Sequence, residues 1–179
     1  MPLKDKIDLA LKAVGLLAVF LGLAQFVDKL YEREQQFRRQ ESAALVKEYL
    51  AELAPLELRI RIMLLPYVSA FNGPAGFNDP KAVSDAEVEN VYRALYLSGL
   101  SPDTAPRLGD LLKILAFYDR VNACIETSLC DSEYIVVALC DAAKQFHSYQ
   151  VRLIQSHKRL TNETHVDTGL TGTVDLCEN

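Results

Sequence analysis

The chain has 179 residues, of which half are hydrophobic, and it carries a formal net charge of −5. This length is enough for one domain of ordinary size with a packed core and for one short segment outside that domain. The mildly acidic balance excludes an overall electrostatic attraction to DNA, because binding to phosphate backbones requires clustered lysine and arginine. No cofactor or resident metal ion is expected from the composition.

The most apolar part of the chain lies close to its beginning. The segment AVGLLAVFLGLAQFV ends at Val27 and has Gln25 as its only polar side chain, and extending it back to Leu9 adds Lys12 as the only charge. A helix of this length approaches the roughly 30 Å hydrocarbon core of a bilayer, with Lys12 close enough to one end to snorkel. The sequence therefore predicts one transmembrane helix within an N-terminal anchor, residues 1–30.

Three alternatives to a spanning helix stay open. A cleaved signal peptide would have Lys4 and Lys6 as its basic start and Gly22 and Ala24 as small residues at the cleavage site. A buried core helix is the second alternative. An interfacial amphipathic helix is the third, although it would need a broad charged face that this segment lacks.

The charges on the two sides of the anchor predict its orientation, because loops rich in lysine and arginine stay in the cytoplasm. Lys4, Lys6 and Lys12 lie before the apolar run, and Lys29, Arg33, Arg38 and Arg39 lie after it. This balance mildly favours a single-pass protein of the bacterial inner membrane with a cytoplasmic C-terminal domain.

Small residues share one face of the predicted anchor. At about 100° per residue, Gly15, Ala18, Gly22 and Gln25 fall within one wedge of the helix, and larger apolar residues occupy the rest. Small residues let neighbouring helices approach, and an intramembrane glutamine avoids lipid by facing a partner or water. The pattern predicts a homo-oligomer in the bilayer, which could surround a pore.

The rest of the chain is expected to be all-α, because no alternating strand pattern of useful length occurs. The anchor should continue as one long helix until near Pro55, and Pro66 should kink or divide the next helix. Ser84 with Glu87 fits a capping box, and Asp131 is a candidate N-cap of the last helix. That helix carries a seam of apolar residues spaced four and three apart: Ile135, Leu139, Ala142, Phe146, Tyr149 and Leu153. Residues 31–160 are thus predicted to form a small helical bundle, and residues 161–179 a flexible polar tail.

Four cysteines, Cys124, Cys130, Cys140 and Cys177, lack the paired spacing of a zinc site. Cys124 and Cys130 flank a short connection between two predicted helices and would form a disulfide if the domain faced an oxidising compartment. In a reducing cytosol they would remain two thiols at helix ends. A periplasmic or secreted domain with this disulfide is therefore an alternative to the cytoplasmic one.

No strong catalytic motif occurs in the chain: there is no glycine-rich phosphate loop, HExxH or Gly-x-Ser-x-Gly. Arg152 and His157, with four residues between them, match the Arg-x(4–6)-His signature of HEPN ribonucleases, in which arginine stabilises phosphate charge and histidine handles the proton. Arg159 and His165 also match it, which shows how readily the pattern arises. A basic helix end that complements the helix dipole is the structural alternative. The sequence favours a non-enzymatic protein, with a membrane-tethered ribonuclease as the alternative.

The layout resembles a family of small bacterial single-pass membrane proteins with a helical C-terminal domain. The likeness is carried by LLKILAFYDRVNACIETSLCDSEYIVVAL, with its hydrophobic-Phe-Tyr-acid stretch and a short turn ending in Leu-Cys-Asp. With the Arg152 and His157 pair, the chain also resembles the membrane accessory proteins of type VI CRISPR defence, which combine an anchor with a degenerate HEPN-like domain and form pores. These resemblances imply a lipid bilayer, further copies of the chain and an RNA-guided effector as partners, and a role in antiviral defence.

Overall fold

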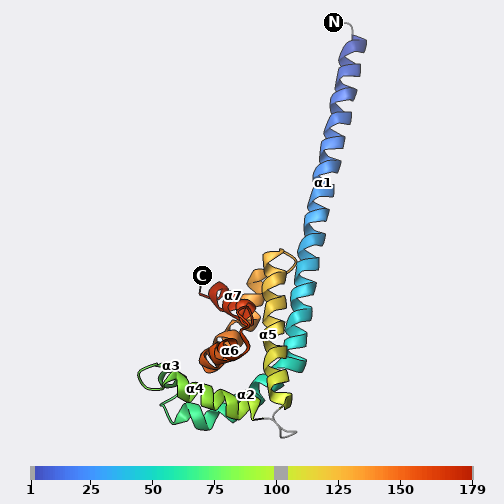
Figure 1. Cartoon of the computed structure of the whole chain (residues 1–179). Helices are drawn as coiled ribbons and strands as arrows, with labels where there is room; N and C mark the ends of the chain where they lie inside the picture. The colour runs from blue at the N-terminus through green and yellow to red at the C-terminus, as the bar shows by residue number, and fades with distance from the viewer. Residues whose placement is uncertain (1–2, 99–104, 179) are drawn as a thin grey trace.

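The computed structural model describes the backbone of residues 3–98 and 105–178, and the side chains of residues 20–98 and 107–178. Every regular element in these ranges is helical, which confirms the all-α prediction. Figure 1 shows a long helix, α1 (Leu3–Glu48), that extends from a bundle of shorter helices as a free arm. Only the C-terminal part of α1 packs against the bundle, chiefly through helix α6.

The long helix ends at Glu48. A π-helical turn, η1 (Tyr49–Leu53), begins six residues before Pro55 and leads into α2 (Ala54–Ser69). Pro55 lies in the first turn of α2, where its missing N–H removes no intrahelical hydrogen bond. Pro66 was expected to kink or divide this helix. It lies in the last turn, and α2 continues through it as one helix, so the division does not occur. The turn at η1 buries Tyr49 and Leu53 against the bundle.

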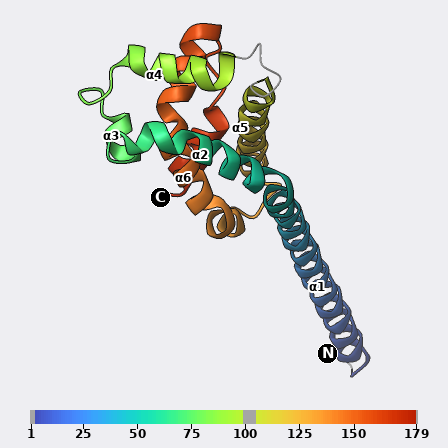
Figure 2. The ribbon, with the colours of Figure 1, turned by 90° about the horizontal axis from the view of Figure 1, so that it is seen from below.

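Short helices follow α2 and cover one side of α6. They are α3 (Pro74–Asn78), α4 (Asp85–Tyr92) and a second π-helical turn, η2 (Arg93–Leu97). The predicted capping box at the start of α4 is confirmed, because the Ser84 Oγ accepts from the Glu87 N–H and the Glu87 carboxylate accepts from the Ser84 N–H. Figure 2 shows α2, α3 and α4 grouped on the side of the bundle that faces away from the arm.

Two long helices form the centre of the bundle: α5 (Ala105–Glu126) and α6 (Ser132–Thr161). Asp131 caps α6, since its carboxylate accepts from the Tyr134 N–H at 3.1 Å. The predicted seam of α6 faces the core, with Ile135 and Leu139 fully buried. Ser42 joins this cap to α1, because its Oγ accepts from the Asp131 N–H at 2.8 Å.

The C-terminal segment differs from its prediction. Residues 161–179 were expected to be a flexible tail, but Thr168–Leu176 form helix α7, which packs on α5 and α6. Its contact with α5 is so close that a Cβ on Gly169 would lie 2.3 Å from the Asp119 Cα. A disulfide from Cys177 to Cys140 holds the end of α7 to α6. Glycine contact and a covalent bond therefore order a segment that has little apolar periodicity.

The predicted anchor lies on the free arm. The part of its apolar run before Phe20, residues 9–19, is helical, and the structure does not describe its side chains. Within residues 20–98 and 107–178, no helix is both long and apolar enough to cross a membrane. From Phe20 onward the arm exposes a series of large apolar side chains: Phe20, Leu21, Leu23, Phe26, Val27, Leu30 and Tyr31.

Candidate functional site

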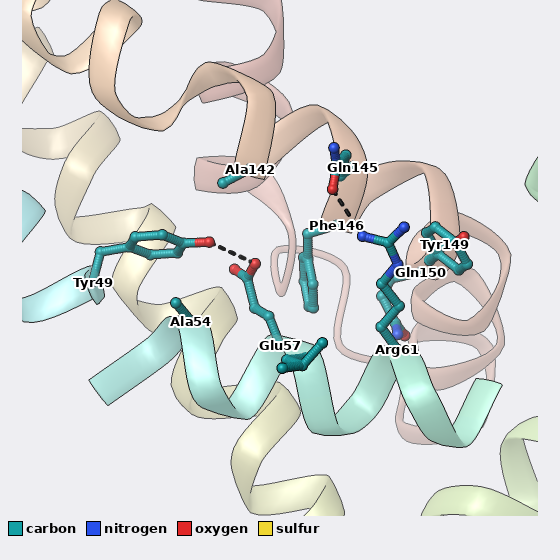
Figure 3. Close-up of a pocket in the computed structure, with 10 residues that line it drawn as sticks. Tyr49, Ala54, Glu57, Arg61, Ala142, Gln145, Phe146, Tyr149 and Gln150 are labelled. Carbon is teal, nitrogen blue, oxygen red and sulfur yellow. Dashed lines mark hydrogen bonds between the residues drawn. The ribbon is translucent and has the colours of Figure 1, made fainter. Parts of the chain in front are cut away.

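A carboxyl group, that of Glu57, lies where four elements of the bundle meet. Glu57 belongs to the first turn of α2. The Tyr49 hydroxyl, from η1, donates to one of its oxygens at 2.8 Å, as Figure 3 shows. The Tyr118 hydroxyl, from α5, donates to the other oxygen at 3.1 Å. Phe146 of α6 completes this cluster, with its ring 6.3 Å from that of Tyr118.

Burial controls the electrostatics of this cluster. Loss of solvent raises the pKa of Glu57 to about 7, although the hydrogen bonds from Tyr49 and Tyr118 act in the opposite direction. Burial, together with the neighbouring carboxylate, also raises the pKa of both tyrosines above their ordinary value. The two phenols therefore stay neutral donors at physiological pH, and Glu57 is the group that titrates near neutrality.

A cavity of about 180 Å³ adjoins Glu57 between α2 and α6 (Figure 3). Its walls combine apolar and polar side chains: Tyr49, Ala54, Glu57, Leu58, Arg61, Ala142, Gln145, Phe146, Tyr149 and Gln150. Arg61 is held in place by α6, because its Nη1 donates to the Gln145 Oε1 at 2.9 Å and its guanidinium carbon lies 4.9 Å from the centre of the Tyr149 ring. A concave apolar site with a few fixed polar groups is the usual form of a small-molecule site.

The Glu57 site was not predicted from the sequence. Glu57 stands in the helical run APLELRIRI, where one acidic residue among apolar ones is a weak signal that the side chain is partly buried. Its hydrogen-bond partners are 8 and 61 residues away along the chain. No local spacing could have joined them, and the π-helical turn that places Tyr49 has no sequence signature of its own.

Arg152, one member of the predicted ribonuclease pair, lies buried between α6 and the segment before α4. Its Nη1 donates to the backbone carbonyls of Phe77 and Val83 at 2.9 and 2.8 Å, and its Nη2 donates to Asp85 at 2.6 Å. Hydrogen bonds from Arg152 and Arg159 hold the pKa of Asp85 below its usual range. The guanidinium thus joins α3, α4 and α6.

His157, the other member of the pair, is also buried on α6, and both of its ring nitrogens have protein partners. Nδ1 lies 2.6 Å from the Tyr92 hydroxyl, and Nε2 lies 3.2 Å from the Glu163 carboxylate. Its ring also packs on that of Tyr92, with centroids 5.8 Å apart. In this arrangement the polar atoms of Arg152 and His157 serve the packing of α4 on α6.

All four cysteines are paired in the structure. Cys124 and Cys130 form a disulfide across the turn between α5 and α6, with Cα atoms 5.3 Å apart. Cys140 and Cys177 form the second, between α6 and the end of α7, with Cα atoms 5.6 Å apart. Only the first pair was considered from the sequence, because Cys177 lies in the segment that was expected to be a flexible tail.

The structure describes half of the predicted self-association face. Gly15 and Ala18 lie outside the described side chains. Gly22 and Gln25 lie on the exposed arm, and a Cβ added to Gly22 would have no neighbour within 4 Å. This part of the face is therefore open in the single chain.

Comparisons of the chain with protein-family models, curated proteins and solved structures find no match.

Proposed function

We propose that this protein is a single-pass membrane protein that assembles through its anchor and holds a disulfide-bonded helical domain on the oxidising side of the membrane. The observation that supports this proposal best is the exposed apolar surface of the free arm. Phe20, Phe26 and Val27 are at least 60% exposed, and the arm projects from the bundle in both views (Figures 1 and 2). Contiguous apolar surface of this kind marks contact with a membrane or a partner.

The length of the apolar run favours lipid as the main contact. Leu9–Val27 is 19 residues long, so as a helix it extends about 28 Å, close to the thickness of the hydrocarbon core. Tyr31, 62% exposed, follows the run at the position of an interfacial aromatic residue. After the apolar run, charged side chains begin at Asp28 and continue toward the bundle.

Self-association is supported by the small face of the arm. Gly22 has open space around it, and Gln25 is an exposed polar side chain among the apolar residues of the run. Close packing of a second helix on Gly22 would gain dispersion contacts that lipid does not provide, and would give Gln25 a hydrogen-bond partner.

The two disulfides favour an orientation opposite to the one predicted from charge. Lysine and arginine counts on the two sides of the anchor differ by one residue, three against four. Both disulfides link segments of the folded domain, and no described cysteine remains free. Such bonds persist in oxidising compartments and are rare in a reducing cytosol. The proposal therefore places the helical bundle outside the cytosol.

The experiment is to express the full chain and measure its membrane retention, particle size and thiol state. Alkaline carbonate should leave the protein in the membrane pellet. In mild detergent we expect an oligomer that Gly22→Leu reduces in size, because the added side chain separates the packed helices. Val27→Leu adds bulk on the opposite side of the same helix and should leave the oligomer intact. A carbonate-soluble protein would overturn the anchor, and an unchanged size for Gly22→Leu would overturn the assembly face.

The orientation has a separate readout. Maleimide-polyethylene glycol applied to denatured, unreduced protein should modify none of the four cysteines, and all of them after reduction. A protease added to intact spheroplasts should degrade the bundle. Four reactive thiols before reduction, or a bundle protected from protease until the membrane is opened, would overturn this placement and leave the anchor proposal standing.

A further inference from the structure

No cationic side chain of the described part of the chain pairs with the carboxylate of Glu57. Both of its hydrogen-bond donors, Tyr49 and Tyr118, are neutral. Arg61, the cation of the same cavity, contacts Gln145 and Tyr149 on α6. Glu57 is only partly buried, but its carboxylate still loses much of its water, so without a counter-charge it is costly and a cation that reaches it is favoured.

Glu57 also retains capacity for a ligand. An ionised carboxylate has about four acceptor sites on its two oxygens. The tyrosine hydroxyls use one on each oxygen. The remaining sites can accept N–H donors from the cavity that adjoins Glu57 (Figure 3).

From this juxtaposition of an uncompensated carboxylate and a small cavity with apolar and polar walls, we propose that the protein binds a small primary ammonium compound with an apolar body. The ammonium group donates to the free acceptor sites of Glu57 and supplies the missing charge. The apolar body lies against Ala54, Leu58 and Phe146.

The cavity limits the size and charge of this ligand. A dry apolar cavity of about 150 Å³ holds one benzene molecule, and the volume here is about 180 Å³. A single ring or a short branched chain therefore fits. Figure 3 shows the Phe146 ring between Glu57 and Arg61, so the guanidinium borders the part of the cavity away from the carboxylate. A second cationic group there would be repelled, which favours monoamines over diamines.

Binding should be linked to protonation of Glu57. Burial keeps much of this carboxyl protonated near neutral pH, because its pKa is raised to about 7. When an ammonium ion binds, the carboxyl gives up its proton to solvent and the carboxylate accepts the N–H bonds. Tyr49 and Tyr118 do not compete, because their pKa values are raised above the ordinary value. Arg61 is the cation that lines the cavity, and its guanidinium contacts Gln145 and Tyr149 on α6 rather than Glu57. Affinity should therefore rise between pH 6 and pH 8.

The test is isothermal titration calorimetry of the full chain in mild detergent with benzylammonium chloride, with a protein-free micelle blank. We expect saturable binding at pH 8, weaker binding at pH 6, and proton release at pH 6.5, measured in two buffers of different ionisation enthalpy. Benzyl alcohol has the same ring and no charge, and should bind at least about tenfold more weakly. Glu57→Gln should weaken benzylammonium binding by a similar factor and abolish proton release.

Glu52→Gln is the matched control. Glu52 is an exposed carboxylate on η1 that pairs with Lys113 at 2.8 Å, outside the cavity. This variant should bind benzylammonium like the unmodified protein. Equal affinity for benzyl alcohol and benzylammonium, unchanged binding by a folded Glu57→Gln variant, or no heat from the folded unmodified protein up to millimolar ligand would each overturn the proposal. None of these outcomes bears on the membrane anchor, because the readout is confined to the bundle.

Discussion

Glu57 should make the stability of the helical bundle depend on pH, in a direction opposite to that of most carboxylates. Its pKa is raised from 4.5 to about 7 in the folded chain, so between these values the native state binds more protons than the unfolded state. The free energy of unfolding should therefore fall as pH rises through this window. A rise of the pKa from 4.5 to about 7 corresponds to a loss of about 3 kcal/mol from this one group.

The measurement is urea unfolding of the full chain in mild detergent, followed by far-ultraviolet circular dichroism at half-unit steps from pH 4.5 to pH 8. Glu57→Gln keeps an oxygen that can accept a tyrosine hydrogen bond and cannot ionise. Its free energy of unfolding should therefore rise relative to the unmodified protein by up to about 3 kcal/mol across the window. Glu52→Gln should give a curve with no such relative rise. If the free energy of unfolding of Glu57→Gln changed with pH in parallel with that of the unmodified protein, the raised pKa of Glu57 would be refuted.

Three further predictions concern the contacts that hold the bundle together, each measured by urea unfolding. Arg152→Met should cost about 3–5 kcal/mol, because it leaves the backbone carbonyls of Phe77 and Val83 without their buried donor. A loss below about 1 kcal/mol would show that the guanidinium is dispensable. Gly169→Ala should cost about 1–3 kcal/mol, because the new methyl overlaps the backbone of α5, whereas Gly109→Ala, with open space around it, should be neutral or stabilising. Cys177→Ser should cost about 2–4 kcal/mol by opening the bond to α6 and should speed amide exchange in α7; unchanged exchange would mean that packing alone orders that helix.

Signals that depend on near neighbours in the chain were sufficient for much of the fold. The capping box of Ser84 and Glu87 and the N-cap at Asp131 involve residues three positions apart, and both are present. The heptad seam of α6 likewise follows from the helical repeat, and Ile135 and Leu139 are buried as it requires. The prediction failed for residues 161–179, where ordering depends on a glycine contact with α5 and on a disulfide to α6.

The functional features divide in the same way. The apolar run that ends at Val27 is continuous in the chain, so its length and its small face can be read from the residues alone. The Glu57 site cannot be read from the residues alone, because its hydrogen-bond donors come from η1 and α5, and α6 lines its cavity. A carboxylate acquires an unusual pKa only when distant segments remove its water, and that removal is a property of the packed tertiary structure. The sequence by itself thus determined the long helices and the apolar arm, while tertiary packing decided the order of the C-terminal segment, which polar side chains became buried and which cysteines were joined.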